Sequence, residues 1–172
     1  MTKALHERYP KIFAEHCEIN TGPGWYNILD SACAAIQNHI ENAHRQHEIA
    51  LKFKAMADDL RAGNDAPFFE HHRHWDPVKD HAFLDRRRQE IMDEDHSPTQ
   101  EPCSQLVATQ IKEKFGTLRF YHDGGDSFCD GVVLMAEVMS GCTCEDCGAP
   151  GRIGGKNWLA TLCDPCRFQR ES

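Results

Sequence analysis

Four cysteines near the C-terminal end have the spacing of a metal site. They form two Cys-x-x-Cys pairs, Cys144 with Cys147 and Cys163 with Cys166, and fifteen residues separate the pairs. Two cysteines three positions apart can grip one ion from a tight turn, and a second such pair completes a tetrahedron of thiolates, a shell typical of structural Zn²⁺. The spacing therefore predicts a zinc knuckle that occupies residues 142–172.

The residues around the two pairs favour zinc over other uses of four cysteines. Gly148 follows the first pair directly, and a residue without a Cβ lets backbone N–H groups turn toward the sulfurs. A short apolar strand with Trp158 and Leu162 then leads to the second pair, as in a small zinc ribbon or a treble-clef-like pair of knuckles. An iron–sulfur cluster also takes four cysteines and is the alternative. A thioredoxin-type redox pair needs a βαβ context that the sequence lacks.

Other residues that could do chemistry are better explained without a ligand. Asp123, Asp126 and Asp130 could hold Mg²⁺ beside a Gly-Gly turn, but a turn and helix start rich in Asp explains them without a ligand, and we favour that explanation. Histidines fall on one predicted helix and in the stretch HHRH (71–74), and we expect them at the surface; those on the helix are His39, His44 and His47. Cys142 lies two residues before the first pair and is expected to be a spare thiol.

The sequence lacks the common catalytic motifs. It has no phosphate-binding Gly-x-x-x-x-Gly-Lys-Ser/Thr loop, no Gly-x-Ser-x-Gly elbow and no His-Glu-x-x-His helix. A zinc ion held by four thiolates has no open position for a reacting water. We therefore expect a protein that is not an enzyme and in which the metal braces the fold.

Composition and charge limit which cellular compartments and classes of protein need to be considered. The 172 residues carry a net charge of −8 and include nine cysteines, an odd number that argues against a disulfide framework. No run of apolar residues could span a membrane and no secretion signal begins the sequence, so we expect a cytoplasmic protein. Segment 61–102 holds six Lys or Arg against ten Asp or Glu, a net −4 that does not resemble a general nucleic-acid binder.

Periodicity predicts an α+β fold with a mainly helical N-terminal body, a β-hairpin and the C-terminal zinc ribbon or knuckle. The body with its hairpin would span 1–141, with 52–102 as a possible insertion, and the knuckle 142–172. Residues 25–61 would form one helix or two helices broken near 44–48. The other expected elements are a short helix over 3–16 that is interrupted at Pro10, a loop at 63–75, a helix at 77–93 capped by Asp76, a linker at 96–102, strands near 105–113 and 117–122, and a helix at 126–139.

Several of these stretches together resemble a family of small phage and prophage proteins of uncharacterised function. The similarity rests on ATQIKEKFGTLRFYHDGGD (108–126), on MAEVMS (135–140) and on the four-cysteine run, and YPKIF (9–13) and GWYNILD (24–30) extend it toward the N-terminus. The resemblance implies a phage origin, a Lys-Glu-Lys-Phe-Gly-x-Leu-Arg-Phe-Tyr hairpin and a life in the bacterial host cytoplasm. Segment 52–102 lies outside it.

Small acidic phage proteins without catalytic groups often act by binding host machinery. We therefore expect a partner that is a host protein or complex, including defence systems of the CRISPR type, with segment 61–102 as the candidate contact. The alternative is an accessory protein that binds nucleic acid through the zinc ribbon. Its candidate residues are Arg152, Lys156, Arg167, Arg170 and Trp158. The sequence leaves the oligomeric state open.

Overall fold

The computed structural model describes residues 2–15, 17–155 and 158–171. The chain divides into two compact units, one made of Met1–Glu41 with Cys103–Ser172 and the other of Asn42–Pro102. The expected knuckle at 142–172 lies within the first unit, and the whole of the expected insertion at 52–102 lies within the second. That 52–102 is an insertion stays a prediction.

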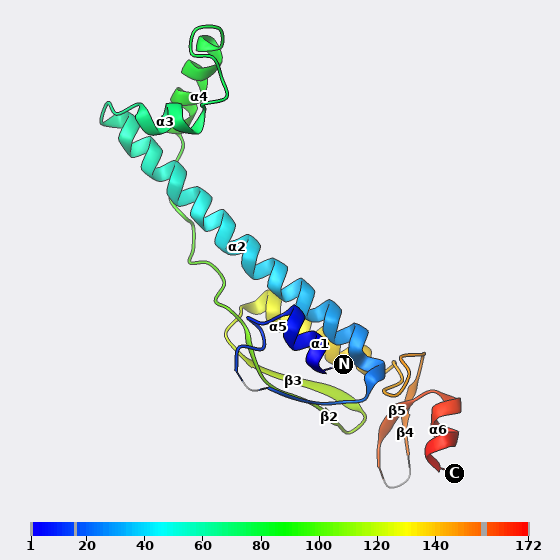
Figure 1. Cartoon of the computed structure of the whole chain (residues 1–172). Coiled ribbons are helices and arrows are strands. Elements are labelled where there is room, and N and C mark those ends of the chain that lie inside the picture. Colours follow the sequence, from blue (N-terminus) through cyan, green and yellow to red (C-terminus); the bar gives the residue numbers. More distant parts are fainter. Residues whose placement is uncertain (1, 16, 156–157, 172) are drawn as a thin grey trace. The chain divides into compact units, whose positions relative to one another are not determined.

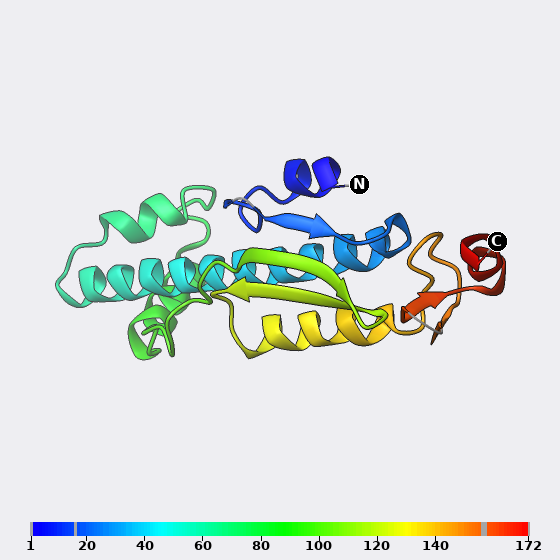
Figure 2. The same cartoon turned by 90° about the horizontal axis from the view of Figure 1, so that it is seen from below.

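The first unit is built around a three-stranded sheet, so the expected α+β class is confirmed. Its strands are β1 (Glu18–Asn20), β2 (Val107–Lys114) and β3 (Thr117–Asp123), in the order β1-β2-β3. The short β1 pairs parallel to β2, and β2 pairs antiparallel to β3. The unit also contains α1 (Thr2–Arg8), η1 (Pro23–Trp25), the first part of α2 (Tyr26–Arg61) and α5 (Ser127–Ser140). Figures 1 and 2 show α2 and α5 running along one face of the hairpin.

The predicted hairpin is confirmed, with strand ends that shift by one or two residues. Lys114 pairs with Thr117, so the loop consists only of Phe115 and Gly116. Both loop residues have positive φ, 54° and 82°, as the favoured two-residue hairpin turn requires. Gly116 adopts this backbone conformation at no steric cost, and its N–H donates to Oε1 of Glu113 at 2.6 Å.

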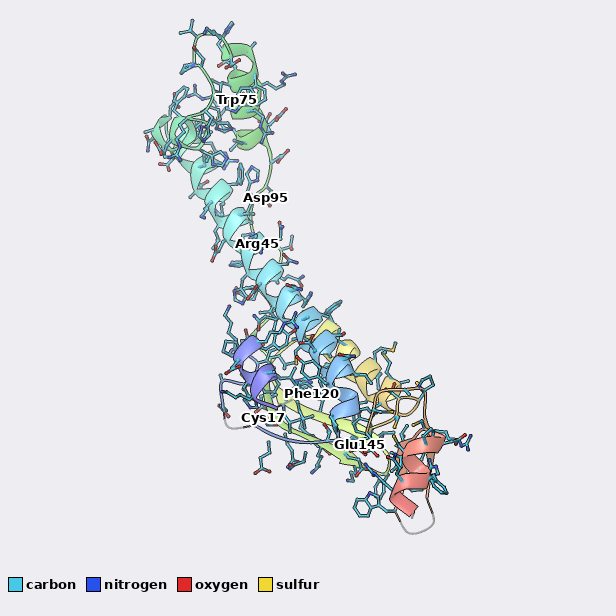
Figure 3. The ribbon with its side chains drawn as sticks, turned by 45° about the vertical axis from the view of Figure 1, so that its right-hand side comes forward. Cys17, Arg45, Trp75, Asp95, Phe120 and Glu145 are labelled. Atoms are coloured by element: carbon cyan, nitrogen blue, oxygen red, sulfur yellow. The ribbon has the colours of Figure 1, made fainter. Side chains whose placement is uncertain are left out.

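Apolar side chains from the helices and the hairpin form the core of this unit. Trp25, Ile28, Ile36 and Ile40 are buried along one side of η1 and α2, at the helical spacing that the sequence shows. The hairpin contributes further buried residues, which are Ala108, Ile111, Leu118 and Phe120. Phe120 points from the hairpin toward these helices in Figure 3.

Helix α5 covers the outer edge of the sheet. Strand β3 is an edge strand, and two of its N–H groups face away from β2. Leu118 donates its backbone N–H to the hydroxyl of Ser140 at 2.8 Å, and Phe120 donates to Oε1 of Glu137 at 3.0 Å. Side chains of α5 therefore satisfy donors that would otherwise be open to pairing with another strand.

The second unit packs α3 (Ala66–His71) and α4 (His81–Asp93) with the later part of α2 around a small apolar cluster. The buried members of that cluster are Met56, Ala57, Leu60, Phe68, Leu84 and Ile91. Helix α2 is continuous over 36 residues and is not broken near 44–48. The expected linker at 96–102 contains no helix or strand.

Two expectations for this unit were wrong. Residues 63–75 are not all loop, because the burial of Phe68 draws 66–71 into a helix. Helix α4 begins at His81, not at 77, since Asp76 caps an isolated turn. Oδ1 of Asp76 accepts hydrogen bonds from the N–H groups of Val78 and Lys79, at 2.9 and 3.1 Å, as the oxygen of an N-cap does, but the turn that it caps covers only 77–79.

Candidate metal centres

The structure brings the four cysteines of the two Cys-x-x-Cys pairs together. The sulfur atoms of Cys144, Cys147, Cys163 and Cys166 all lie within 4.8 Å of one another, and those of Cys147 and Cys163 are 3.6 Å apart. All nine cysteines of the chain are thiols. Four thiols at these separations can hold a metal ion at their centre.

Local backbone geometry places each pair. Gly148 adopts a positive φ of 79°, and its N–H donates to the carbonyl oxygen of Cys144 at 2.8 Å, which closes the first turn. Strands β4 (Arg152–Gly154) and β5 (Ala160–Leu162) form a short antiparallel hairpin that leads to Cys163. Cys166 then lies in the first turn of α6 (Asp164–Glu171). The sequence suggested either a small zinc ribbon or a treble-clef-like pair of knuckles. The observed order of knuckle, hairpin and helix matches the treble-clef-like layout.

The electrostatics of the cluster favour a bound cation. Burial opposes ionisation of Cys144, but hydrogen bonds from the backbone of Cys163, Cys147 and Asp146 outweigh it and lower the pKa to about 6. The pKa of Cys166 is raised, because hydrogen bonds with Cys163 and Cys147 hold its proton. Without a cation, four adjacent sulfurs cannot all carry negative charge, because like charges at these separations repel one another. A metal ion removes this conflict.

The knuckle is docked on the sheet and helices by backbone contacts. Gly24 donates its N–H to the carbonyl oxygen of Glu145 at 2.7 Å, and Gly22 donates to Oε1 of the same residue at 2.9 Å. The hydroxyl of Thr161 donates to the carbonyl oxygen of Gly116, in the hairpin turn, at 2.5 Å. Glu145 itself is buried where the knuckle meets the start of α2 (Figure 3), and that burial raises its pKa.

Segment 142–172 also contains the spare thiol and the residues that the sequence suggested for nucleic-acid binding, and these lie outside the cluster of four cysteines. Cys142 is exposed, and its thiol donates to the carbonyl oxygen of Met139 at 3.2 Å, consistent with a spare thiol. Arg152 is paired with Asp164 at 2.7 Å, and Arg170 is paired with Asp146. Trp158 is 72% exposed, while Lys156 lies outside the described residues.

A second cluster of potential ligands was not expected from the sequence. His39, Cys103, Asp126 and Cys129 bring their ligand atoms within 4.8 Å of one another. Only Asp126 of the expected acidic trio takes part: Asp130 instead lies 3.6 Å from Nε2 of His122. The two clusters are the metal-capable groups within the described part of the chain, and they include neither His44, His47 nor the histidines of 71–74.

The charges at the second cluster are set by its hydrogen bonds and its burial. A hydrogen bond from His39 lowers the pKa of Asp126 to about 2, with further help from the N–H of Cys129. Burial raises the pKa of Cys103 to about 12, and the adjacent Cys129 adds to that shift. The group therefore combines an ionised carboxylate with two buried sulfurs.

Comparison with known proteins found no relative of the chain. No family model matches the chain, and no similar sequence or fold was found among curated proteins or solved structures. The resemblance to phage proteins stays a prediction. No helix in the described residues is both long and apolar enough to cross a membrane.

Proposed function

We propose that this chain is a zinc-binding phage protein without enzymatic activity that binds a protein complex of the bacterial host and inhibits or modulates it. Defence complexes, including those of the CRISPR type, are the first class of partner to test. The proposal is supported by an apolar surface on α5 and by a cysteine cluster whose closed shell suits bracing rather than catalysis.

Zinc fits the four-cysteine cluster better than a polynuclear iron cluster. In a tetrahedral site with metal–sulfur bonds near 2.3 Å, sulfurs lie about 3.8 Å apart. The observed sulfur–sulfur separations are 3.6 Å for one pair and no more than 4.8 Å for any pair, and such separations suit a single ion at the centre. In a four-iron cluster each cysteine ligates a different iron, which holds the sulfurs farther apart. Elemental analysis of the purified chain should find zinc, and an iron signal in its place would contradict this part of the proposal.

The observation that carries the binding function is the outer face of α5. Leu134, Met135, Val138 and Met139 are each between 47% and 63% exposed and lie at helical spacing. A hollow of about 330 Å³ adjoins them, lined by residues between Asn27 and Ala32 of α2 and by Val132, Met135, Ala136 and Met139. Contiguous exposed apolar surface marks interaction sites, and methionine adapts its shape to a partner.

Charge suggests what kind of partner approaches this surface. The chain carries a net −8, and the second unit carries nine Lys or Arg against thirteen Asp or Glu, a net −4. Such a field steers association toward basic surfaces and repels nucleic acid. The favoured partner is therefore a host protein with a basic surface, such as one that handles nucleic acid, that offers an apolar segment to the α5 face.

Affinity capture of host proteins tests the proposal. The full chain, tagged and expressed in host cells, should retain a stoichiometric host protein whose activity it inhibits. Changing Leu134→Asp together with Val138→Asp should abolish both capture and inhibition, because charges on the α5 face prevent its burial. Val78→Asp is the matched control, since Val78 is 81% exposed in the second unit. A failure to capture any partner, or equal capture by the α5 variant, would contradict the proposal.

The nucleic-acid alternative has one feature in its favour, the exposed ring of Trp158. Two of its four candidate cations, Arg152 and Arg170, are however neutralised by carboxylates within the knuckle. A mobility-shift assay at low salt separates the two functions, because an unretarded probe under those conditions removes the alternative.

A further inference from the structure

His39, Cys103, Asp126 and Cys129 come from three separate segments of the first unit. His39 lies on α2, Cys103 lies on the segment before β2, and Asp126 and Cys129 lie at the start of α5. Asp126 is the N-cap of α5, so Cys129 follows it by less than one turn on the same side of the helix. Nε2 of His39 and Oδ2 of Asp126 are 2.8 Å apart, and the two sulfurs are 4.0 Å apart.

We propose that these four side chains form a second metal site, separate from the four-cysteine cluster, that binds Zn²⁺ through two sulfurs, one imidazole nitrogen and one carboxylate oxygen. This inference does not depend on the proposed function of the chain. It follows from the identity of the donors, their separations and the way that neighbouring groups orient them.

The separation of the sulfurs fits one shared ion. In a tetrahedral zinc site two sulfurs lie about 3.8 Å apart, close to the 4.0 Å between Cys103 and Cys129. A disulfide would require about 2.05 Å. Both cysteines are buried, with Cys129 fully so and Cys103 8% exposed, whereas the side chains of His39 and Asp126 reach the solvent edge. An ion can therefore enter from that edge and meet the two sulfurs beneath.

The donor set selects the metal. Two thiolates exclude Mg²⁺ and Ca²⁺, which prefer oxygen ligands, and one imidazole with one carboxylate completes a set that Zn²⁺ accepts readily. His39 Nε2 and Asp126 Oδ2 are closer than the roughly 3.4 Å expected of tetrahedral neighbours. Their hydrogen bond is thus the metal-free arrangement, and the pair must open by about half an ångström as the ion enters and takes both lone pairs.

Neighbouring groups hold the ligands in place. The other oxygen of Asp126, Oδ1, accepts the N–H groups of Phe128 and Cys129 at 3.0 and 3.2 Å, which leaves Oδ2 directed at His39. The imidazole of His39 is stacked on the ring of Phe128, with ring centroids 4.2 Å apart. Ligands that are oriented in this way before binding lose little conformational freedom when the metal arrives.

The Gly-Gly turn before α5 allows this close assembly. Gly125 has a positive φ of 83°, and a Cβ placed on it would stand only 2.9 Å from Cβ of Cys129. Gly125 also exchanges hydrogen bonds with Ser104, the neighbour of Cys103, through its N–H at 3.1 Å and its carbonyl oxygen at 3.4 Å. The turn therefore allows the segments that carry Cys103 and Cys129 to lie close together. A bound metal would link the start of α5 to α2.

Metal counting on the full chain tests the site. The protein, purified under reducing conditions, saturated with Zn²⁺ and freed of loosely bound metal, should hold two equivalents per chain. His39→Ala should hold about one, because it removes a ligand from the solvent edge without emptying the core. Cys142→Ser, a change at an exposed thiol outside both clusters, should still hold two. Cys147→Ser with Cys163→Ser should keep the second ion and lose the first.

Cobalt substitution gives a readout that does not depend on stoichiometry. With Co²⁺ in both sites the visible spectrum should contain a four-sulfur signature and a second set of bands from the mixed site. His39→Ala and Asp126→Asn should each remove the second set alone. One equivalent in the wild type, two equivalents in His39→Ala, a purely four-sulfur cobalt spectrum, or a disulfide between Cys103 and Cys129 would each overturn the proposal.

Discussion

The indole nitrogen of Trp25 donates a 2.8 Å hydrogen bond to the carbonyl oxygen of Thr143. Trp25 is fully buried at the end of η1, directly before α2, and Thr143 immediately precedes Cys144, the first of the four clustered cysteines. One side chain therefore belongs to the apolar core and also fixes the segment that leads into the four clustered cysteines. Folding of the body and placement of the cysteines are coupled through this contact.

Trp25→Phe should destabilise the protein by about 2–3 kcal/mol, because it leaves the Thr143 carbonyl without its donor and opens a small cavity. Urea unfolding at saturating zinc measures the change. Trp158→Phe is the matched control: its ring is 72% exposed, and we expect a change within about 0.5 kcal/mol. Equal effects of the two substitutions would contradict the role given to Trp25.

Gly24→Ala should weaken both folding and zinc retention. A Cβ on Gly24 would stand 2.2 Å from the carbonyl oxygen of Cys144 and 2.5 Å from the backbone nitrogen of Gly148, so rigid backbone would have to move. We expect a loss of about 3 kcal/mol or more. Gly131→Ala is the control of opposite sign, since nothing lies within 4 Å of its Cβ position in α5 and alanine favours a helix by about 1 kcal/mol. Urea midpoints and zinc content of both variants give the comparison.

The sequence predicted the parts of the site that depend on local spacing. The two Cys-x-x-Cys pairs predicted the first cluster. Phe115-Gly116, between two stretches in which apolar and polar residues alternate, predicted the hairpin. The second cluster has no such signal, because His39 and Asp126 are separated by 87 positions and meet only once α2 and α5 lie on the same sheet. The one available cue was Asp126 and Cys129 at one-turn spacing after a Gly-Gly turn.

Elsewhere, tertiary packing overrode local preference. The stretch that contains Phe68 reads as a polar, histidine-rich loop, yet the burial of that ring makes 66–71 helical. The role of the Gly22–Trp25 turn was equally hidden, because its partners Glu145 and Thr143 lie more than a hundred residues away. Long-range partners of a turn leave no periodic trace in the sequence.

Removal of the metal should loosen the knuckle before the rest of the first unit. The apolar residues buried within the knuckle are few, with Cys144, Ala160 and Leu162 at its centre, so a bound ion would supply much of its local stability. Under a strong chelator, hydrogen exchange should accelerate at the amides of Cys144, Glu145 and Gly151. The hairpin amide of Ile111 should stay protected, and added zinc should restore the original pattern. Unchanged protection of residues 142–155 and 158–168 would contradict this account.

Ser140→Ala should destabilise the sheet edge. The hydroxyl of Ser140 is buried and accepts the N–H of Leu118, while it donates to the carbonyl oxygen of Glu137 at 2.5 Å. Without it a buried donor of β3 has no partner, which costs about 1–3 kcal/mol. Glu137→Gln keeps an oxygen acceptor for Phe120 and should cost less than about 1 kcal/mol, since its ion pair with Arg119 is long and partly exposed. Urea unfolding of both variants checks the ranking.

Tyr9 gives the fold a dependence on alkaline pH. Its hydroxyl lies 3.0 Å from both the carbonyl oxygen and Oδ1 of Asp30, and burial, together with that carboxylate, raises its pKa from 10.0 to about 12. The folded chain therefore holds this proton more tightly than the unfolded chain does. The resulting stability is complete below pH 10 and is lost as the pH rises toward 12, by roughly 1 kcal/mol per pH unit.

Tyr9→Phe should therefore cost about 1 kcal/mol near neutral pH, where a hydrogen bond is lost, and progressively less as the pH rises from 10 toward 12. Urea unfolding of wild type and variant at pH 9 and pH 11 measures the difference, and tyrosinate absorbance should lose its latest step in the variant. Tyr121→Phe is the control, because Tyr121 is 43% exposed on β3 and its removal should leave the late step in place. A stability difference between wild type and Tyr9→Phe that stays constant over this range would show that the Tyr9 proton is not held by the fold.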